Sequence, residues 1–145
     1  MTAAQLRACI LVILLAVCTA QDLEYRHVAL PAAVSGIPAG IAITVVLRDL
    51  GRLSVAGGIL IGFLLLAAAL PTKGAVGTGD GLVLAQAGAL IGAADCLTLL
   101  VTALLLIMAW ASLMFLFGRV KKTDSIPFVP FILAAYLLML AAGAG

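Results

Sequence analysis

Two aspartates stand at the edges of long apolar stretches in this sequence. Asp22 directly follows one such stretch, and Asp80 lies between Gly77-Thr78-Gly79 and another. Charged groups inside or at the edge of a membrane bundle are costly, which makes them candidates for function. Two carboxylates held close together cannot both ionise easily, so one keeps a proton. Such a pair can activate water with one member and protonate a leaving amide with the other, which makes Asp22 and Asp80 the candidate catalytic residues.

The glycines before Asp80 permit positive φ and close backbone approach, so a substrate backbone can pass near this acid. Residue types alone also allow a simpler interpretation, in which Asp80 caps its helix and Asp22 lies at the membrane interface. The acids in polar segments are expected to be solvated: Glu24, Asp49 and Asp124. Asp95 is expected to form a tight turn by itself and to cap the following helix.

The composition indicates a membrane protein. Of 145 residues 66% are hydrophobic, and only eight Lys or Arg and six Asp or Glu residues are present. A soluble domain carries charge on roughly a quarter of its residues, so an ordinary soluble domain and a disordered chain are excluded. The net charge of +2 and the lack of a basic run beyond Lys121-Lys122 give no support for nucleic acid as a partner. The three cysteines lie far apart without a CxxC or Cys/His cluster, so no metal site is predicted.

The spacing of the charges predicts an all-α, polytopic integral membrane protein with about six transmembrane helices in one domain, 1–145. Uncharged runs cover residues 28–47, 53–70, 96–118 and 125–145, and a membrane-crossing helix needs about 20 residues. The helices are expected at about 3–21, 28–47, 53–70, 81–94, 96–118 and 126–143. The first of these requires Arg7 to reach the membrane interface with its side chain, and the fourth is short for a span.

The charged turns predict an orientation in the membrane. Six helices put both termini on one side, and the first, third and fifth turns hold five Lys or Arg residues against three on the other side. The positive-inside rule then places those turns, together with Asp22 and Asp80, on the cytoplasmic side of a cell membrane. The N-terminal stretch also looks like a cleavable secretory signal. We expect it to be retained, because cleavage would remove the helix that leads into Asp22.

Small residues spaced four apart predict close contacts between helices. The pairs are Gly36 and Gly40, Gly58 and Gly62, and Gly88 and Gly92. Such spacing lets helix backbones approach each other in a membrane bundle. We expect these glycines to serve packing.

Three stretches resemble the type IV prepilin peptidase family of intramembrane aspartyl proteases. Gly77-Thr78-Gly79-Asp80 matches the GxGD signature, and Asp22-Leu23-Glu24-Tyr25-Arg26 is similar to the family's segment around its first aspartate. Ile126-Pro127-Phe128-Val129-Pro130 looks like the family's entry to its last helix. The three stretches follow one another in the family's order, and the resemblance covers nearly the whole chain.

The resemblance implies a peptidase that removes the basic leader from pilin-like precursors at the cytoplasmic membrane face. Asp22 and Asp80 match the two catalytic aspartates, and Gly77, Thr78, Gly79 and Pro127 would position the substrate. No metal or organic cofactor is implied. Bifunctional relatives also methylate the new N-terminus and carry a segment with paired CxxC motifs. This chain looks like the short, core-only form found with Flp/Tad-type pili and in archaeal systems, so we expect peptidase activity and leave methylation open.

Two positions depart from the family's pattern. Leu82 stands where a lysine is frequent, and Val28-Ala29-Leu30 stands in place of Ile-Pro-Asn. Functions of other classes also fit two acids in a membrane bundle. One is a small proton- or cation-coupled transporter in which Asp22 and Asp80 bind the ion, and another is a scaffold subunit without chemistry.

Overall fold

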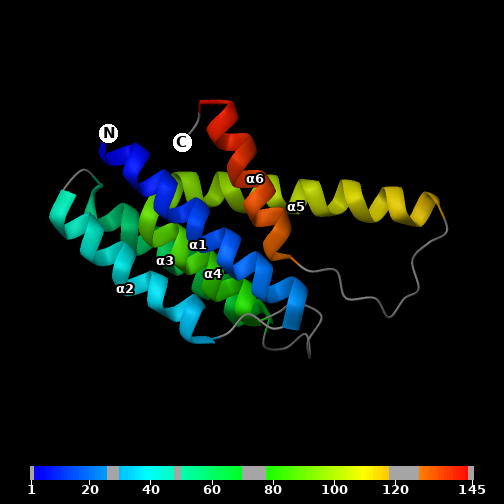
Figure 1. Cartoon of the computed structure of the whole chain (residues 1–145), viewed down its shortest axis with the longest axis horizontal. Helices are drawn as coiled ribbons and strands as arrows, with labels where there is room; N and C mark the ends of the chain where they lie inside the picture. Colours follow the sequence, from blue (N-terminus) through cyan, green and yellow to red (C-terminus); the bar gives the residue numbers. More distant parts are fainter. Residues whose placement is uncertain (1, 26–29, 48–49, 70–77, 118–127, 144–145) are drawn as a thin grey trace.

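The computed structural model is a helical bundle, in which residues 2–25, 30–47, 50–69, 78–117 and 128–143 are described (Figure 1). These ranges contain six helices and no strand, which confirms the predicted all-α class. The helices are α1 (Ala3–Tyr25), α2 (Leu30–Leu47), α3 (Arg52–Ala69), α4 (Thr78–Ile91), α5 (Ala93–Leu116) and α6 (Val129–Ala141).

Three of the helices are long and apolar enough to cross a membrane. They include the segments Ala4–Glu24, Arg52–Ala69 and Ala93–Leu116. The other three hold shorter apolar segments, Gly36–Val46, Gly79–Ile91 and Val129–Ala141. Length and composition therefore support membrane association through α1, α3 and α5.

Helix α4 has neighbours on most of its surface. It packs against α1, α2, α3 and α5, and every residue from 83 to 90 is buried. Its 14 residues give a length of about 21 Å, against about 30 Å for the hydrocarbon core of a bilayer. Because neighbouring helices cover it, α4 does not need the length or the continuous lipid contact of a free-standing span.

Glycines bring the backbones of α3 and α4 into contact, as the spacing of small residues predicts. Gly58 of α3 lies against the backbone of Gly88 of α4, and Gly62 lies against Ala85. A Cβ atom at any of these glycines would overlap the facing helix. Gly40 of α2 makes a similar approach to Ala89 of α4. The three helices α2, α3 and α4 thus form a closely packed layer.

The turn between α4 and α5 does not lie at Asp95, where the sequence predicts it. It lies at Gly92, whose φ of 84° belongs to the left-handed region that glycine adopts without strain. The side chain of Ser54 in α3 secures this turn, because its Oγ accepts a hydrogen bond from the Ala93 N–H at 3.1 Å. Asp95 is therefore not a turn residue: it lies in the first turn of α5, where the positive end of the helix dipole favours an acid.

Two helix ends also differ from the predicted ranges. Helix α1 continues to Tyr25, so Asp22 lies inside the helix rather than just after it. Helix α4 begins at Thr78, so Asp80 belongs to its first turn. The hydropathy pattern shows where polar residues begin, but helical structure extends beyond that point in both cases.

The fully buried residues of helix α5 lie in its first half. Cys96, Leu99 and Ala103 are its buried residues, and large apolar side chains such as Leu105, Met108 and Phe115 are exposed further on. Figure 1 shows α5 extending past α6 on one side of the bundle. Exposed apolar side chains of this kind are expected where lipid covers a helix.

Candidate active site

Asp22 lies on the buried face of α1. Arg7, Leu11, Leu15, Cys18 and Asp22 follow each other at intervals of three or four residues, and all five side chains are buried. This spacing places them in one stripe along the helix. Asp22 is 9% exposed and is the last residue of this stripe, so its carboxylate lies at the end of a buried helix face.

Asp80 is also 9% exposed, and it lies in the first turn of α4. The next residue, Gly81, lies so close to α3 that a Cβ atom there would come within 2.7 Å of the backbone nitrogen of Leu66. The α3 contact therefore fixes the backbone beside Asp80. The N-terminal end of a helix carries partial positive charge, which stabilises the ionised form of an acid at this position.

The two aspartates lie at the same end of the bundle. Arg7, near the start of α1, donates a hydrogen bond from Nη1 to the carbonyl oxygen of Leu90, near the end of α4, at 2.9 Å. The helices also pack against each other, so they run in opposite directions. The end of α1 and the start of α4 accordingly meet at one end of the bundle in Figure 1.

A shared apolar core lies beneath the two acids. Cys18, one turn before Asp22, and Leu84, one turn after Asp80, belong to the same cluster of buried residues. Two carboxylates beside this buried cluster have little water around them.

The residues expected to position a substrate are described only in part. Thr78 is the first residue of α4, and Gly79 follows it, half-buried. Gly77 and Pro127 lie outside the described residues, so the parts assigned to them stay predictions.

The position of Arg7 differs from the one predicted from the sequence. Its side chain does not extend to the membrane interface: it is 4% exposed, and besides Leu90 it donates to Thr44 Oγ1 of α2 at 3.2 Å. The last four carbonyl groups of a helix lack intrahelical partners, and the C-terminal end of the dipole attracts a cation. The end of α4 therefore offers Arg7 a better site than the interface. The signal that could have predicted this is its spacing from Asp22 on the same face of α1.

Within the described ranges, no three His, Cys, Asp or Glu residues lie close enough to share a metal ion. No protein-family model matches the chain, and no significant match was found among curated proteins or solved structures.

Proposed function

We propose that this protein is a membrane-embedded aspartic endopeptidase that removes the leader peptide from type IV pilin-like precursors. The observation that carries the proposal is the placement of Asp22 and Asp80, two buried carboxylates on contacting helices at one end of the bundle. The resemblance of Gly77-Thr78-Gly79-Asp80 to the GxGD signature supplies the reaction class.

The reaction is hydrolysis of one peptide bond. The ionised aspartate takes a proton from a water molecule, whose oxygen then adds to the scissile carbonyl carbon. The protonated aspartate gives its proton to the nitrogen of the leaving amine as the C–N bond breaks. Asp22 and Asp80 exchange these roles in the course of the cycle, and no cofactor takes part.

The proposed membrane arrangement has all six helices within the bilayer of a cell membrane. The long helices α1, α3 and α5 span it, and the shorter helices α2, α4 and α6 are covered by them and by each other. Because α4 is shorter than the hydrocarbon core is thick, Asp80 at its start lies below the membrane surface. The precursor would bring its leader junction to this depth from the cytoplasmic side, which the distribution of Lys and Arg favours.

The direct test is cleavage of a pilin-like precursor that is co-expressed with this protein, followed as a shift in electrophoretic mobility. Asp22→Asn and Asp80→Asn should each slow cleavage at least about 100-fold, because proton transfer by a positioned side chain contributes roughly 10²–10⁴-fold. Glu24→Gln is the matched control, since Glu24 is exposed and only two residues from Asp22. Its cleavage rate should equal that of the unaltered protein.

Two results would contradict the proposal. One is normal cleavage by either aspartate variant in membranes that contain equal amounts of folded protein. The other is ion flux into vesicles that depends on Asp22 and Asp80 without cleavage of any precursor, as a transporter predicts.

A further inference from the structure

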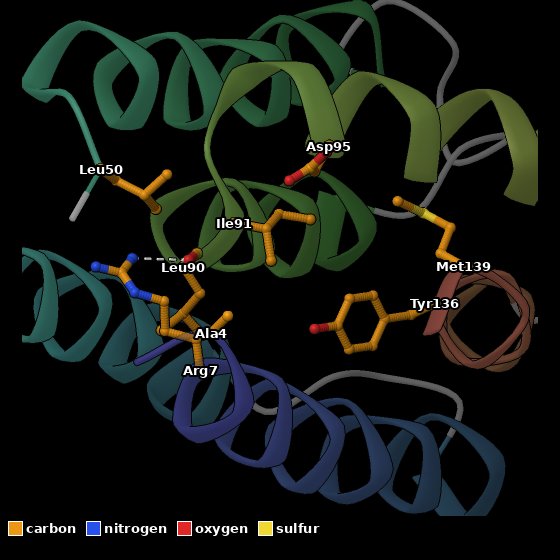
Figure 2. Close-up of a pocket in the computed structure, with 8 residues that line it drawn as sticks. All are labelled: Ala4, Arg7, Leu50, Leu90, Ile91, Asp95, Tyr136 and Met139. Atoms are coloured by element: carbon orange, nitrogen blue, oxygen red, sulfur yellow. Dashed lines mark hydrogen bonds between the residues drawn. The ribbon is translucent and has the colours of Figure 1, made fainter. Parts of the chain in front are cut away.

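A cavity of about 100 Å³ lies at the other end of α4, away from the two aspartates. Five apolar side chains line it, together with three polar ones (Figure 2). The apolar residues are Ala4, Leu50, Leu90, Ile91 and Met139, and the polar residues are Arg7, Asp95 and Tyr136. The cavity thus joins α1, α4, α5 and α6 where the first of these begins and α4 ends.

Arg7 does not neutralise the acid in this cavity. Its guanidinium is directed at the carbonyl oxygen of Leu90, and the hydrogen bond is drawn in Figure 2. In the part of the chain that the structure describes, Asp95 makes neither a hydrogen bond nor an ion pair. A half-buried carboxylate beside apolar walls is stabilised by a hydrogen-bond donor, and none of the described residues that line the cavity donates to Asp95.

Tyr136 presents a second acceptor. The residue is only 2% exposed, yet its hydroxyl has no hydrogen-bond partner among the described residues. Figure 2 shows the hydroxyl pointing into the cavity, and it lies near enough to Asp95 for the two groups to interact electrostatically. Because the hydroxyl faces the cavity, a molecule bound there can be its hydrogen-bond partner.

The chemistry of the occupant follows from these groups. The carboxylate of Asp95 and the hydroxyl of Tyr136 both accept hydrogen bonds, and Arg7 is already bonded to the Leu90 carbonyl at the end of α4. The cavity has room for about three water molecules, which suits an ammonium group with a short carbon chain against Leu90 and Ile91. A trimethylammonium group has no N–H to donate and would leave both acceptors unsatisfied.

We propose that this cavity binds a primary ammonium group, that of an ethanolamine phospholipid, between Asp95 and Tyr136. The lipid is the favoured source because the cavity lies at an end of the bundle, where α1 begins and α6 ends and where apolar helices meet the headgroup level. This site is separate from the proposed peptidase chemistry and does not depend on it.

The test measures thermal unfolding of the purified protein in detergent with added phospholipids of identical acyl chains. Phosphatidylethanolamine should raise the melting temperature more than phosphatidylcholine or phosphatidylglycerol. Asp95→Asn removes the negative charge but keeps the shape, and it should weaken the apparent affinity for phosphatidylethanolamine by about tenfold or more. Tyr136→Phe should weaken it by a smaller factor. Glu24→Gln, at the far end of α1, is the matched control and should leave the preference intact.

A second arm distinguishes the source of the amine. Ethanolamine alone, added at millimolar concentration, should give little stabilisation if the lipid chains contribute to binding. An equal shift from ethanolamine alone would support the same ammonium site with a free amine as its ligand. Equal stabilisation by all three lipids and none by ethanolamine would overturn the proposal. An unchanged preference for phosphatidylethanolamine in both Asp95→Asn and Tyr136→Phe would also overturn it.

Discussion

The two ends of α4 have different charged groups around them. At the C-terminal end, Arg7 donates to the Leu90 carbonyl and the Gly92 N–H donates to the Gly88 carbonyl, so these two helix-end carbonyl groups have donors. At the N-terminal end, Asp80 and the neighbouring α1 bring two groups of the same charge to one end of the bundle. The first arrangement gives helix-end carbonyl groups a donor, and the second places two buried acids on contacting helices.

The hydrogen bonds of Arg7 and the two acids that we propose to be catalytic therefore lie at opposite ends of one helix. The helix dipole agrees with both arrangements, because acids belong at its N-terminal end and cations at its C-terminal end. What differs is the balance of charges around each end. The hydrogen bonds of Arg7 contribute to folding, whereas the two acids are the groups for which we propose a catalytic role.

The largest stability effect should come from breaking the matched end. Arg7→Met removes two buried hydrogen bonds from a charged group and should lower the free energy of unfolding by about 3 kcal/mol, since such bonds contribute about 1.5–3 kcal/mol each. Asp80→Asn should change it by less than about 1 kcal/mol, because Asn also suits the start of a helix. The measurement is unfolding in mixed micelles of detergent and SDS, followed by circular dichroism.

Arg52→Met is the control for loss of a positive charge, since Arg52 is exposed and should tolerate the change. If Asp80→Asn proved as destabilising as Arg7→Met, the two ends would not differ in the way described.

A substitution in the middle of α4 should have a smaller effect on the free energy of unfolding, and in the opposite direction. Gln86 is fully buried against Gly36 of α2, and neither polar atom of its amide has a hydrogen-bond partner in the described residues. Gln86→Met has a similar shape without these polar atoms, and it should raise the free energy of unfolding by about 2 kcal/mol. Gln5→Met at the exposed start of α1 removes the acceptor for the Thr2 N–H and should lower the free energy of unfolding by less than about 1 kcal/mol. A destabilised Gln86→Met protein would mean that the amide has a partner in solution.

The smallest expected effect concerns the turn that fixes the C-terminal end of α4. Ser54→Ala removes the acceptor for the Ala93 N–H and should cost about 1 kcal/mol, as for the loss of a helix N-cap. Ser112→Ala is the matched control, since the Ser112 hydroxyl is exposed and bonds only to the Met108 carbonyl of its own helix. Equal unfolding free energies for the two variants would mean that Ser54 does not secure the turn.

The sequence predicts the helices better than their ends. Uncharged runs show where α1 to α6 lie, because hydrophobic length decides what can enter a bilayer. The sequence did not predict the turn at Gly92, because that glycine also fits the small-residue spacing of Gly88 and Gly92. Only the backbone angle distinguishes a packing glycine from one that allows a positive φ.

The candidate site shows a similar division. Asp22 and Asp80 stand out in the sequence because acids are rare next to apolar runs. The burial of Arg7 and the cavity formed with Asp95 and Tyr136 do not stand out, because they depend on which helix ends meet in space. Long-range contacts of this kind follow from the packing of α1 against α4 rather than from any local pattern.

The contact between Gly58 and Gly88 limits how the molecule can rearrange. Because their backbones touch, α3 and α4 can neither slide nor rotate past each other without separating, and they move as one rigid body. A motion that changes the distance between the two aspartates is therefore a tilt of α1, with the bond from Arg7 to Leu90 as its pivot. Asp22 lies 15 residues from that pivot, or about 22 Å, so a tilt of about 5° displaces it by about 2 Å. A small rotation at one end of the bundle therefore shifts Asp22 relative to Asp80 at the other end.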